Sequence, residues 1–480
     1  MMSGKSRFLK GVLCVLFGLC FTPVIAKGNW VTQTAGDRAL AAVRRSDLGA
    51  RNASGKLSQL PLSEHLRRAS IYMANRAFSE AREHWQAVMA YYPDDPRFPE
   101  ALLGVGRSYF QAKNYEESFK VFDRLSRDFP ATKEGREGLN YSAAAMLRLG
   151  RFDEAVERYS EYTRRYPVGE RIETAHLNVI DTLREAKRPR EALAWVETTR
   201  KRFSGSATET NALFAQLRLQ IAESDWPAAV TTADLLLKSR FHKEVDTSLN
   251  EVTYLKGFSL ERAGKKAAAF SVYASVPEGL DSYYGWLATE RMLALADGPR
   301  KAIAEERLAK INREIQAAQA QYPAPYRQPV LRIAKSRKLD PRFVLALMKQ
   351  ESVFRPTAKS PAGARGLLQL TMDAAQKYAG PAGVSNLTET QLYQPEASIK
   401  LGVEYLAQLS KMFPQMLEPV AASYNGGEDN VARWVKRARH HDPGVFTAEV
   451  GFDETKGYVQ KVMANYRVYR QLYTPDLLKR

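Results

Sequence analysis

Residues 340–370 read DPRFVLALMKQESVFRPTAKSPAGARGLLQL, and the first third of this stretch predicts a helix. Asp340 and Pro341 start it, because an aspartate caps the first turn and proline lacks an N–H that this turn leaves unpaired. One face carries three apolar residues and one acid: Val344, Leu347, Met348 and Glu351. Burial and the negative end of the helix dipole should both raise the pKa of Glu351. A glutamate that keeps its proton can act as a general acid, whereas a Glu351 that faces solvent is the simpler alternative.

The predicted helix is followed by an irregular loop with two glycines and a second apolar segment. Together, residues 351–369 resemble the catalytic signature of the lytic transglycosylases with a goose-lysozyme-like domain, E-S-x-F-x-P-x-A-x-S-x-x-G-A-x-G-L-M-Q. Leu368 stands where the family usually has methionine, a substitution that conserves volume. The resemblance implies a lysozyme-like α-helical catalytic domain in which Glu351 is the catalytic residue.

Two later blocks resemble the same family and follow in the same order. Residues 422–427, ASYNGG, resemble A-x-Y-N-A-G, but residues 428–430, EDN, stand where Pro-Gly-Arg is commoner. Residues 452–459, FDETKGYV, resemble F-x-E-T-R-x-Y-V, with Lys456 in place of the arginine and Gly451 in place of the preceding proline. Three blocks in the family's order strengthen the resemblance, and the departures leave the turn after the second block unexplained.

The resemblance assigns substrate binding to seven residues: Ser360, Leu368, Gln369, Tyr424, Asn425, Glu454 and Tyr458. Ser360 and Gln369 would hydrogen-bond the sugars, with the Leu368 backbone beside them. The Tyr424 hydroxyl would lie near the reacting centre, in a turn that Asn425 fixes. Glu454 and Tyr458 would sit across the cleft. An acid that merely stabilises a first helical turn, and a tyrosine that merely packs in the core, are the alternatives for these last two.

The signature contains one carboxylate, whereas a retaining lysozyme-type hydrolase needs an acid and a nucleophile about 5–5.5 Å apart. Asp373 is the obvious second candidate, but we interpret it as the N-cap of a helix that begins near Ala374. The resemblance therefore implies cleavage between N-acetylmuramic acid and N-acetylglucosamine by Glu351 alone, as acid and then as base, with closure of a 1,6-anhydro ring. A hydrolase of the same fold acting on peptidoglycan or chitin, and a non-catalytic adaptor, are the alternatives.

The N-terminus predicts export. Residues 1–26 combine three basic residues, a short apolar run and small residues before a cleavage point after Ala26, as a secretory signal peptide does. An uncleaved anchor is one alternative. A lipoprotein modified at Cys20 is another, although Leu19 precedes this cysteine where a small residue is expected. Cys14 and Cys20 both lie in the signal, so the mature chain would lack disulfides and thiolate sites. The six histidines show no zinc spacing, and we expect no metal and no cofactor.

The chain carries a formal charge of +18, and its predicted signal contributes only three of the basic residues. An exported cationic protein suits an anionic polymer or membrane surface, and peptidoglycan glycan strands are the partner that the resemblance implies. Nucleic acid is not expected, because no binding motif is present and the protein is exported. The expected location is the periplasm.

Residues 60–276 repeat with a period of 37. Three sets of residues recur at this interval: Phe78, Tyr115, Phe152, Pro189 and Trp226; Ala81, Ser118, Ala155, Ala192 and Ala229; and Tyr92, Phe129, Tyr166 and Phe203. One unit reads as helix, turn, helix and a proline-containing loop, which resembles tetratricopeptide-type repeats. Such units stack into a superhelix, so these aromatic residues are expected to pack between helices. The concave face is expected to serve a protein partner or to hold glycan.

These patterns predict an all-α protein: a TPR-like superhelical solenoid followed by the lysozyme-like domain. The expected segments are a signal peptide (1–26), an N-terminal segment (27–59), the solenoid (60–298), a charged helical linker (299–328) and the catalytic domain (329–480). Residues 281–288, DSYYGWLA, resemble a stretch that soluble lytic transglycosylases carry upstream of the catalytic domain. Later helices are expected near residues 395–410, 417–425, 428–440 and 453–473.

Overall fold

The computed structural model describes residues 35–480, and the predicted signal peptide with its two cysteines lies outside this range. The described chain is helical from α1 to α23, and its β pairing is limited to four isolated bridges. The predicted all-α class is therefore confirmed. Among the helices described, none is both long and apolar enough to cross a membrane.

The N-terminal helices form the expected solenoid. They are α1 (Ala35–Gly49), α2 (Leu62–Ala74), α3 (Phe78–Tyr91), α4 (Phe98–Gln111), α5 (Tyr115–Asp128), α6 (Lys133–Arg148), α7 (Phe152–Arg165), α8 (Ile172–Glu185), α9 (Pro189–Arg202), α10 (Ala207–Ala222), α11 (Trp226–Lys238), α12 (Leu249–Arg262), α13 (Lys266–Ala274) and α14 (Tyr283–Leu295). From α2 to α14 each helix packs against the next in sequence. Helix α1 lies in the segment that was expected to precede the repeats.

The 37-residue period has a physical cause at the turn inside each unit. The first recurring set supplies the first residue of α3, α5, α7, α9 and α11. Two residues earlier, each unit has a backbone in the left-handed region: Arg76, Lys113, Gly150, Lys187 and Ser224. This conformation ends one helix and lets the chain turn directly into the next.

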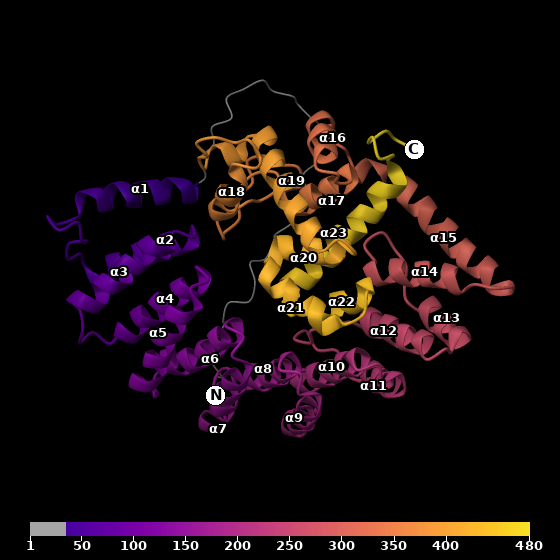
Figure 1. Cartoon of the computed structure of the whole chain (residues 1–480), viewed down its shortest axis with the longest axis horizontal. Coiled ribbons are helices and arrows are strands. Elements are labelled where there is room, and N and C mark those ends of the chain that lie inside the picture. The colour runs from indigo at the N-terminus through magenta and orange to yellow at the C-terminus, as the bar shows by residue number, and fades with distance from the viewer. Residues whose placement is uncertain (1–34) are drawn as a thin grey trace, which may run out of the picture.

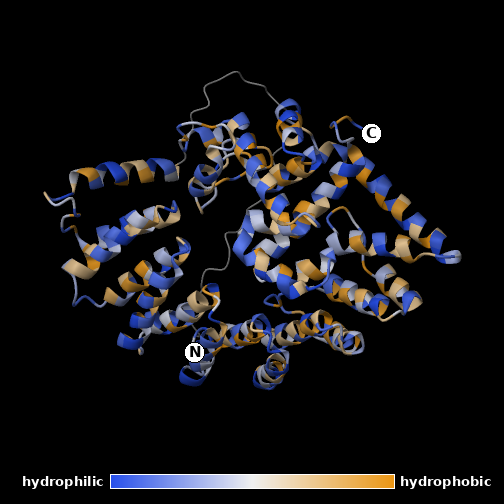
Figure 2. Ribbon diagram, in the orientation of Figure 1, coloured by the Kyte–Doolittle hydropathy of each residue, from blue (hydrophilic) through white to orange (hydrophobic). Residues whose placement is uncertain are grey.

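The other two recurring sets confirm the predicted packing role. The small residues of the second set have no exposed surface at all, which lets paired helices approach closely. The third set caps the ends of α3, α5, α7 and α9. Hydrophilic and hydrophobic residues alternate in short stretches along each helix, as Figure 2 shows.

The C-terminal helices begin with the predicted linker, α15 (Pro299–Ala317), and a short 3-10 turn, η1 (Gln319–Gln321). The catalytic region follows as α16 (Arg327–Ser336), α17 (Pro341–Ser352), α18 (Met372–Ala379), η2 (Gln391–Tyr393), α19 (Pro395–Met412), α20 (Leu417–Gly426), α21 (Glu428–Ala438), α22 (Pro443–Glu449) and α23 (Asp453–Leu472). Four of these match the expected later helices within about two residues. Helix α22 was not predicted, because its seven residues are too short for an apolar period.

The solenoid curves into an arc, and the catalytic region lies in its opening (Figure 1). Near the middle of the arc, α8 and α10 pack on α21 and α22, and later α12 and α14 pack on α22 and α23. At the free end of the arc, α1 reaches the loop before η2, where Arg44 pairs with Glu389 at 3.3 Å. The catalytic region is therefore held by the solenoid at both ends of the arc.

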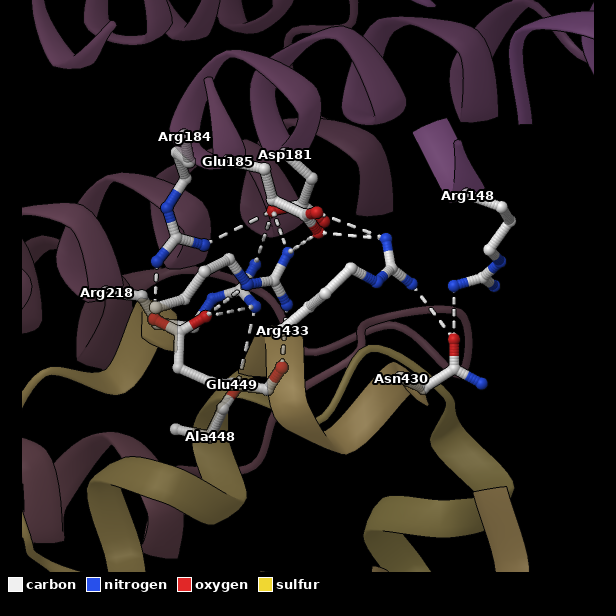
Figure 3. A network of polar contacts seen from close by, with 10 residues as sticks. Arg148, Asp181, Arg184, Glu185, Arg218, Asn430, Arg433, Ala448 and Glu449 are labelled. Atoms are coloured by element: carbon white, nitrogen blue, oxygen red, sulfur yellow. Dashed lines mark hydrogen bonds and ion pairs between the residues drawn. The ribbon is translucent and has the colours of Figure 1, made fainter. Parts of the chain in front are cut away.

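A buried ionic network joins the two regions (Figure 3). Glu449, with 1% of its surface exposed, pairs with guanidinium groups from α8, α10 and α21: Arg184, Arg218 and Arg437. Glu185 on α8 accepts ion pairs from two arginines of α21. Buried charges are tolerated only when they are paired, so this network fixes the two regions in one arrangement.

Candidate active site

Helix α17 carries Glu351 as predicted. The Asp340 side chain accepts the backbone N–H of Arg342 at 2.9 Å and caps the first turn. The apolar face of Val344, Leu347 and Met348 has no exposed surface. The helix ends directly after Glu351, where Val353 and Phe354 both adopt positive φ values of 48° and 60°. Two consecutive left-handed residues without glycine are strained, and such strain concentrates at functional sites.

Glu351 is partly buried, and its carboxyl contacts Tyr458 of α23, whose hydroxyl donates a hydrogen bond to Oε1 at 2.6 Å. Burial raises the pKa of Glu351 to about 7, with a smaller rise from the charge of Glu454 and an opposing effect of the Tyr458 bond. Since Tyr458 occupies Oε1, the other oxygen, Oε2, is free to carry the proton. Near neutral pH this carboxyl can both give and take a proton.

The loop after α17 folds back on the helix and places Leu368 and Gln369. The Ser352 hydroxyl donates to the Leu367 carbonyl at 2.8 Å and ties the loop to the end of α17. Gln369 has a φ of 45°, and its amide donates to the Ala358 and Gly366 carbonyls at 3.0 and 2.8 Å. The Leu368 carbonyl accepts the Tyr424 hydroxyl at 2.8 Å. The first two blocks of the signature therefore meet through this bond.

The second and third blocks also meet. The Thr455 hydroxyl donates to the Asn425 side chain at 2.6 Å, so Asn425 joins α20 to the start of α23. Glu454 is exposed beside it. Burial and the charge of Glu351 hold the pKa of Tyr424 well above its ordinary value, which keeps the Tyr424 hydroxyl protonated.

Several residues that depart from the family pattern contact the solenoid. Asp429 pairs with Lys113 at 2.7 Å, and Asn430 accepts a hydrogen bond from Arg148. Lys456 pairs with Glu251 at 3.3 Å and donates to the Asp246 carbonyl at 2.8 Å. Three of the replaced residues thus face the repeats, whereas Glu428 pairs with Lys377 of α18 at 3.2 Å.

A cavity of about 670 Å³ lies between solenoid and catalytic region. Predicted site residues line it, namely Gln369, Tyr424, Asn425 and Glu454. Glu351 is not in the lining, but its carboxyl interacts electrostatically with Tyr424 and Glu454, which are. The cavity is large enough for sugar rings, and its wall offers both aromatic faces and hydrogen-bonding groups.

Several cavity residues were missed by the sequence analysis. Three tyrosines stack in a row along one wall, with ring centroids 4.7 and 5.1 Å apart: Tyr378, Tyr405 and Tyr424. The solenoid contributes six more residues: Arg76, Phe110, Gln111, Lys113, Tyr115 and Arg148. Tyr115 was predicted as a repeat residue only. Nothing in a repeat sequence distinguishes the units that face the catalytic region from the others.

Ser360 and Asp373 lie in surroundings other than those predicted. Ser360 lies in a turn, where its hydroxyl accepts the Ala364 N–H at 3.1 Å, and it does not line the cavity. The prediction that Asp373 caps α18 is wrong, because the helix begins at Met372 and its N-cap is Thr371. Asp373 instead forms an ion pair with Arg76 at 2.9 Å. Burial raises the pKa of its carboxyl, but hydrogen bonds from Arg76 and Thr371 outweigh burial and leave that pKa lowered. Within residues 35–480, no group of three or more His, Cys, Asp or Glu side chains could hold a metal ion.

Comparison with known proteins gives partial matches. A protein of Salmonella typhimurium named soluble lytic murein transglycosylase is 30% identical over 159 residues, covering 31% of this chain and 23% of that protein. The membrane-bound lytic murein transglycosylase F of Vibrio cholerae is 37% identical over 116 residues, covering 22% and 20%. The chain thus matches less than a quarter of the length of these curated relatives. The match to the solved structure of lytic transglycosylase Slt from Pseudomonas aeruginosa covers 92% of this chain and 77% of that protein, with a TM-score of 0.49 and 19% sequence identity.

Family matches divide the chain in the same way as the fold does. Residues 328–446 match the transglycosylase SLT domain, and residues 66–131 and 143–207 match tetratricopeptide repeats. The chain therefore combines N-terminal tetratricopeptide repeats with a C-terminal transglycosylase SLT domain.

Proposed function

We propose that this protein is a peptidoglycan lytic transglycosylase. It cleaves the β-1,4 bond between N-acetylmuramic acid and N-acetylglucosamine without water and leaves 1,6-anhydro ends. Glu351 is the single general acid and base. The SLT domain and the names of the sequence relatives support the reaction class. The observation that carries the proposal is the carboxyl of Glu351, which has a pKa raised to about 7 and a hydrogen bond from Tyr458 at 2.6 Å.

The reaction uses one proton twice. Protonated Glu351 gives its proton to the glycosidic oxygen, the bond from this oxygen to C1 breaks, and the electron pair stays with the departing sugar. The muramoyl C1 becomes oxocarbenium-like, with help from the neighbouring N-acetyl group. Glu351, now ionised, removes the proton of the muramoyl 6-hydroxyl while O6 bonds to C1. The ring closes, Glu351 regains its proton, and no water is consumed. A pKa near 7 suits both halves.

The remaining site residues hold the substrate and the charge. Tyr424 lies close enough to Glu351 to feel its charge, so its hydroxyl can steady the acetamido group and the developing charge. Gln369 and Asn425 line the same cavity. The row of tyrosines gives the cavity an aromatic wall. Asp373 is held in an ion pair with the solenoid, which argues against its use as a nucleophile.

A hydrolase of the same fold is the second candidate, because one observation favours it. Glu454 is exposed in the cavity, and its charge contributes to the raised pKa of Glu351. An ionised carboxylate at that position could stabilise an oxocarbenium ion or activate water. The products of the two reactions differ by one water molecule.

The setting follows from the same proposal. Export by residues 1–26 would bring the protein to the periplasm, where its substrate lies. The positive charge of the chain favours an anionic cell-wall polymer or membrane surface. The solenoid surface away from the catalytic region is available to a protein partner.

Mass spectrometry of the products from purified peptidoglycan tests the proposal, with the unchanged protein beside Glu351→Gln and Glu454→Gln. Sugar ends one water lighter than hydrolysis gives, lost in Glu351→Gln and retained in Glu454→Gln, are expected. Fully hydrated ends that disappear in both variants would establish the hydrolase instead. The absence of products from the unchanged protein would refute both candidates.

A further inference from the structure

The loop of the first signature block is held from outside the catalytic region by α1, the helix at the free end of the solenoid arc. Asp37 in the first turn of α1 lies 328 residues from Arg365 in the chain, yet its carboxylate accepts Nε and Nη2 of Arg365 at 3.1 and 2.5 Å. It also accepts Nζ of Lys359 at 2.8 Å and the Tyr393 hydroxyl at 2.6 Å. Three residues of the catalytic region, two from the loop after α17 and one from η2, thus converge on one carboxylate of the solenoid.

This contact is buried. Asp37 exposes 7% of its surface and Arg365 2%, and Arg365 is among the largest fully buried side chains of the described chain. Hydrogen bonds from Lys359, Tyr393 and Arg365 hold the pKa of Asp37 well below its ordinary range, despite the opposing effect of burial. A guanidinium can be buried only opposite a negative charge, so Arg365 depends on Asp37 for its place.

Arg365 in turn shapes the loop that carries the site. Its backbone N–H donates to the Leu370 carbonyl at 2.9 Å and its carbonyl accepts the Leu370 N–H at 3.1 Å. These two bonds close a short loop that contains Leu368 and Gln369. Within the loop, the Leu368 carbonyl accepts the Tyr424 hydroxyl, and Gln369 lines the cavity. Displacement of Arg365 therefore moves the groups next to the reacting centre.

We propose that Asp37 is a positioning residue of the active site: by neutralising the buried Arg365, helix α1 sets the loop of residues 358–370 in its working conformation. The N-terminal helix is then a part of the catalytic machinery, although it touches no reacting atom. Asp37 has no place in the three signature blocks, and nothing in the sequence distinguishes it from Asp47, the other acid of the N-terminal segment. This inference rests on the proposed function for its activity readout, but its structural readout does not.

The full chain with Asp37→Asn tests the proposal, because asparagine keeps the size and removes the charge. The matched control is Glu389→Gln, which breaks the exposed pair between the same helix and the same region while leaving the loop untouched. Amide hydrogen exchange should become faster in residues 358–370 of Asp37→Asn and stay unchanged in the control. On soluble glycan strands of alternating N-acetylglucosamine and N-acetylmuramic acid, kcat/KM should fall about 100-fold in Asp37→Asn, as a misplacement of about 1 Å produces.

A double-variant cycle separates positioning from general destabilisation. If Asp37 acts through Arg365, Asp37→Asn combined with Arg365→Gln should be no worse than the more impaired single variant. The alkaline limb of the pH profile should stay in place, because Asp37 does not contact Glu351. Multiplying effects in the double variant, or exchange that rises equally over the whole chain, would overturn the proposal.

The proposal stays testable if Asp37→Asn fails to fold or if the unchanged protein is inactive. If Asp37→Asn does not fold, Tyr393→Phe replaces it as the test, because this variant removes one hydrogen bond to Asp37 without unbalancing a charge. Faster amide hydrogen exchange in residues 358–370 of Tyr393→Phe supports the proposal. Unchanged exchange there overturns it. If the unchanged protein is inactive on glycan strands, the proposed function fails, and the exchange comparison of Asp37→Asn with Glu389→Gln still decides on the positioning role.

Discussion

Replacing Glu351, the proposed catalytic residue, should stabilise the protein by an amount that depends on pH. The pKa of Glu351 is raised from 4.5 to about 7, mainly by burial. Below pH 4.5 both the folded and the unfolded chain hold the proton, and the group contributes nothing to the pH dependence. Between pH 4.5 and 7 the folded chain keeps a proton that the unfolded chain has lost. The free energy of unfolding must therefore fall as the pH rises through this window.

The size of the effect follows from the shift. At about 1.36 kcal/mol per pKa unit, ionised Glu351 costs the folded protein about 3 kcal/mol above pH 7. Glutamine has nearly the same shape as the protonated glutamate and does not ionise. Glu351→Gln should therefore be about as stable as the unchanged protein near pH 4.5. Between pH 5 and 8 the stability difference should grow by about 2.5 kcal/mol in favour of the variant.

Urea unfolding at pH 5, 6, 7 and 8 measures this difference, because all other titrating groups are common to both proteins. With a slope of roughly 2 kcal/mol per molar urea, the midpoints should separate by about 1 M between pH 5 and 8. Glu389→Gln, which replaces an exposed acid, should show no such trend and serves as the control. If the stability difference between Glu351→Gln and the unchanged protein stays constant with pH, the claim that ionised Glu351 destabilises the folded protein is refuted.

Three shorter predictions follow from other contacts. Tyr458→Phe removes the hydrogen bond that lowers the pKa of Glu351, so the alkaline limb of the kcat/KM profile should move up by about one pH unit. A downward shift of that limb would contradict the role of this hydrogen bond. Gly366→Ala should abolish activity and lower the melting temperature, because φ is +80° and a Cβ would stand 1.9 Å from the Leu392 carbonyl; a normal melting curve would contradict the loop geometry. Glu449→Gln removes the negative charge that three guanidinium groups share, and it should lower the free energy of unfolding by about 3–5 kcal/mol. Urea titration measures this loss. A loss below about 1 kcal/mol would show that the network does not stabilise the fold.

The sequence by itself determined the elements that depend on neighbours along the chain. The 37-residue period follows from short-range rules, in which a left-handed residue ends one helix and a small residue lets its partner approach. The helix that carries Glu351 follows from the same kind of rule, because a helix start, an apolar face and an acid lie within twelve residues. The resemblance of residues 351–369 to the family signature then singled out this acid. The order of the three blocks then pointed to the other residues of the catalytic region.

Only the tertiary structure decided which distant groups meet. The contact of Tyr458 with Glu351 joins residues 107 apart, and the contact of Asp37 with Arg365 joins residues 328 apart. Repeat units look alike in sequence, so the ones that form a wall of the cavity are set by the curvature of the whole arc. Asp429 and Asn430, which the sequence left unexplained, gain partners from the turn between α4 and α5 and from the end of α6. Periodicity fixes what a helix buries, but the charge partners of a buried group depend on the closure of the arc.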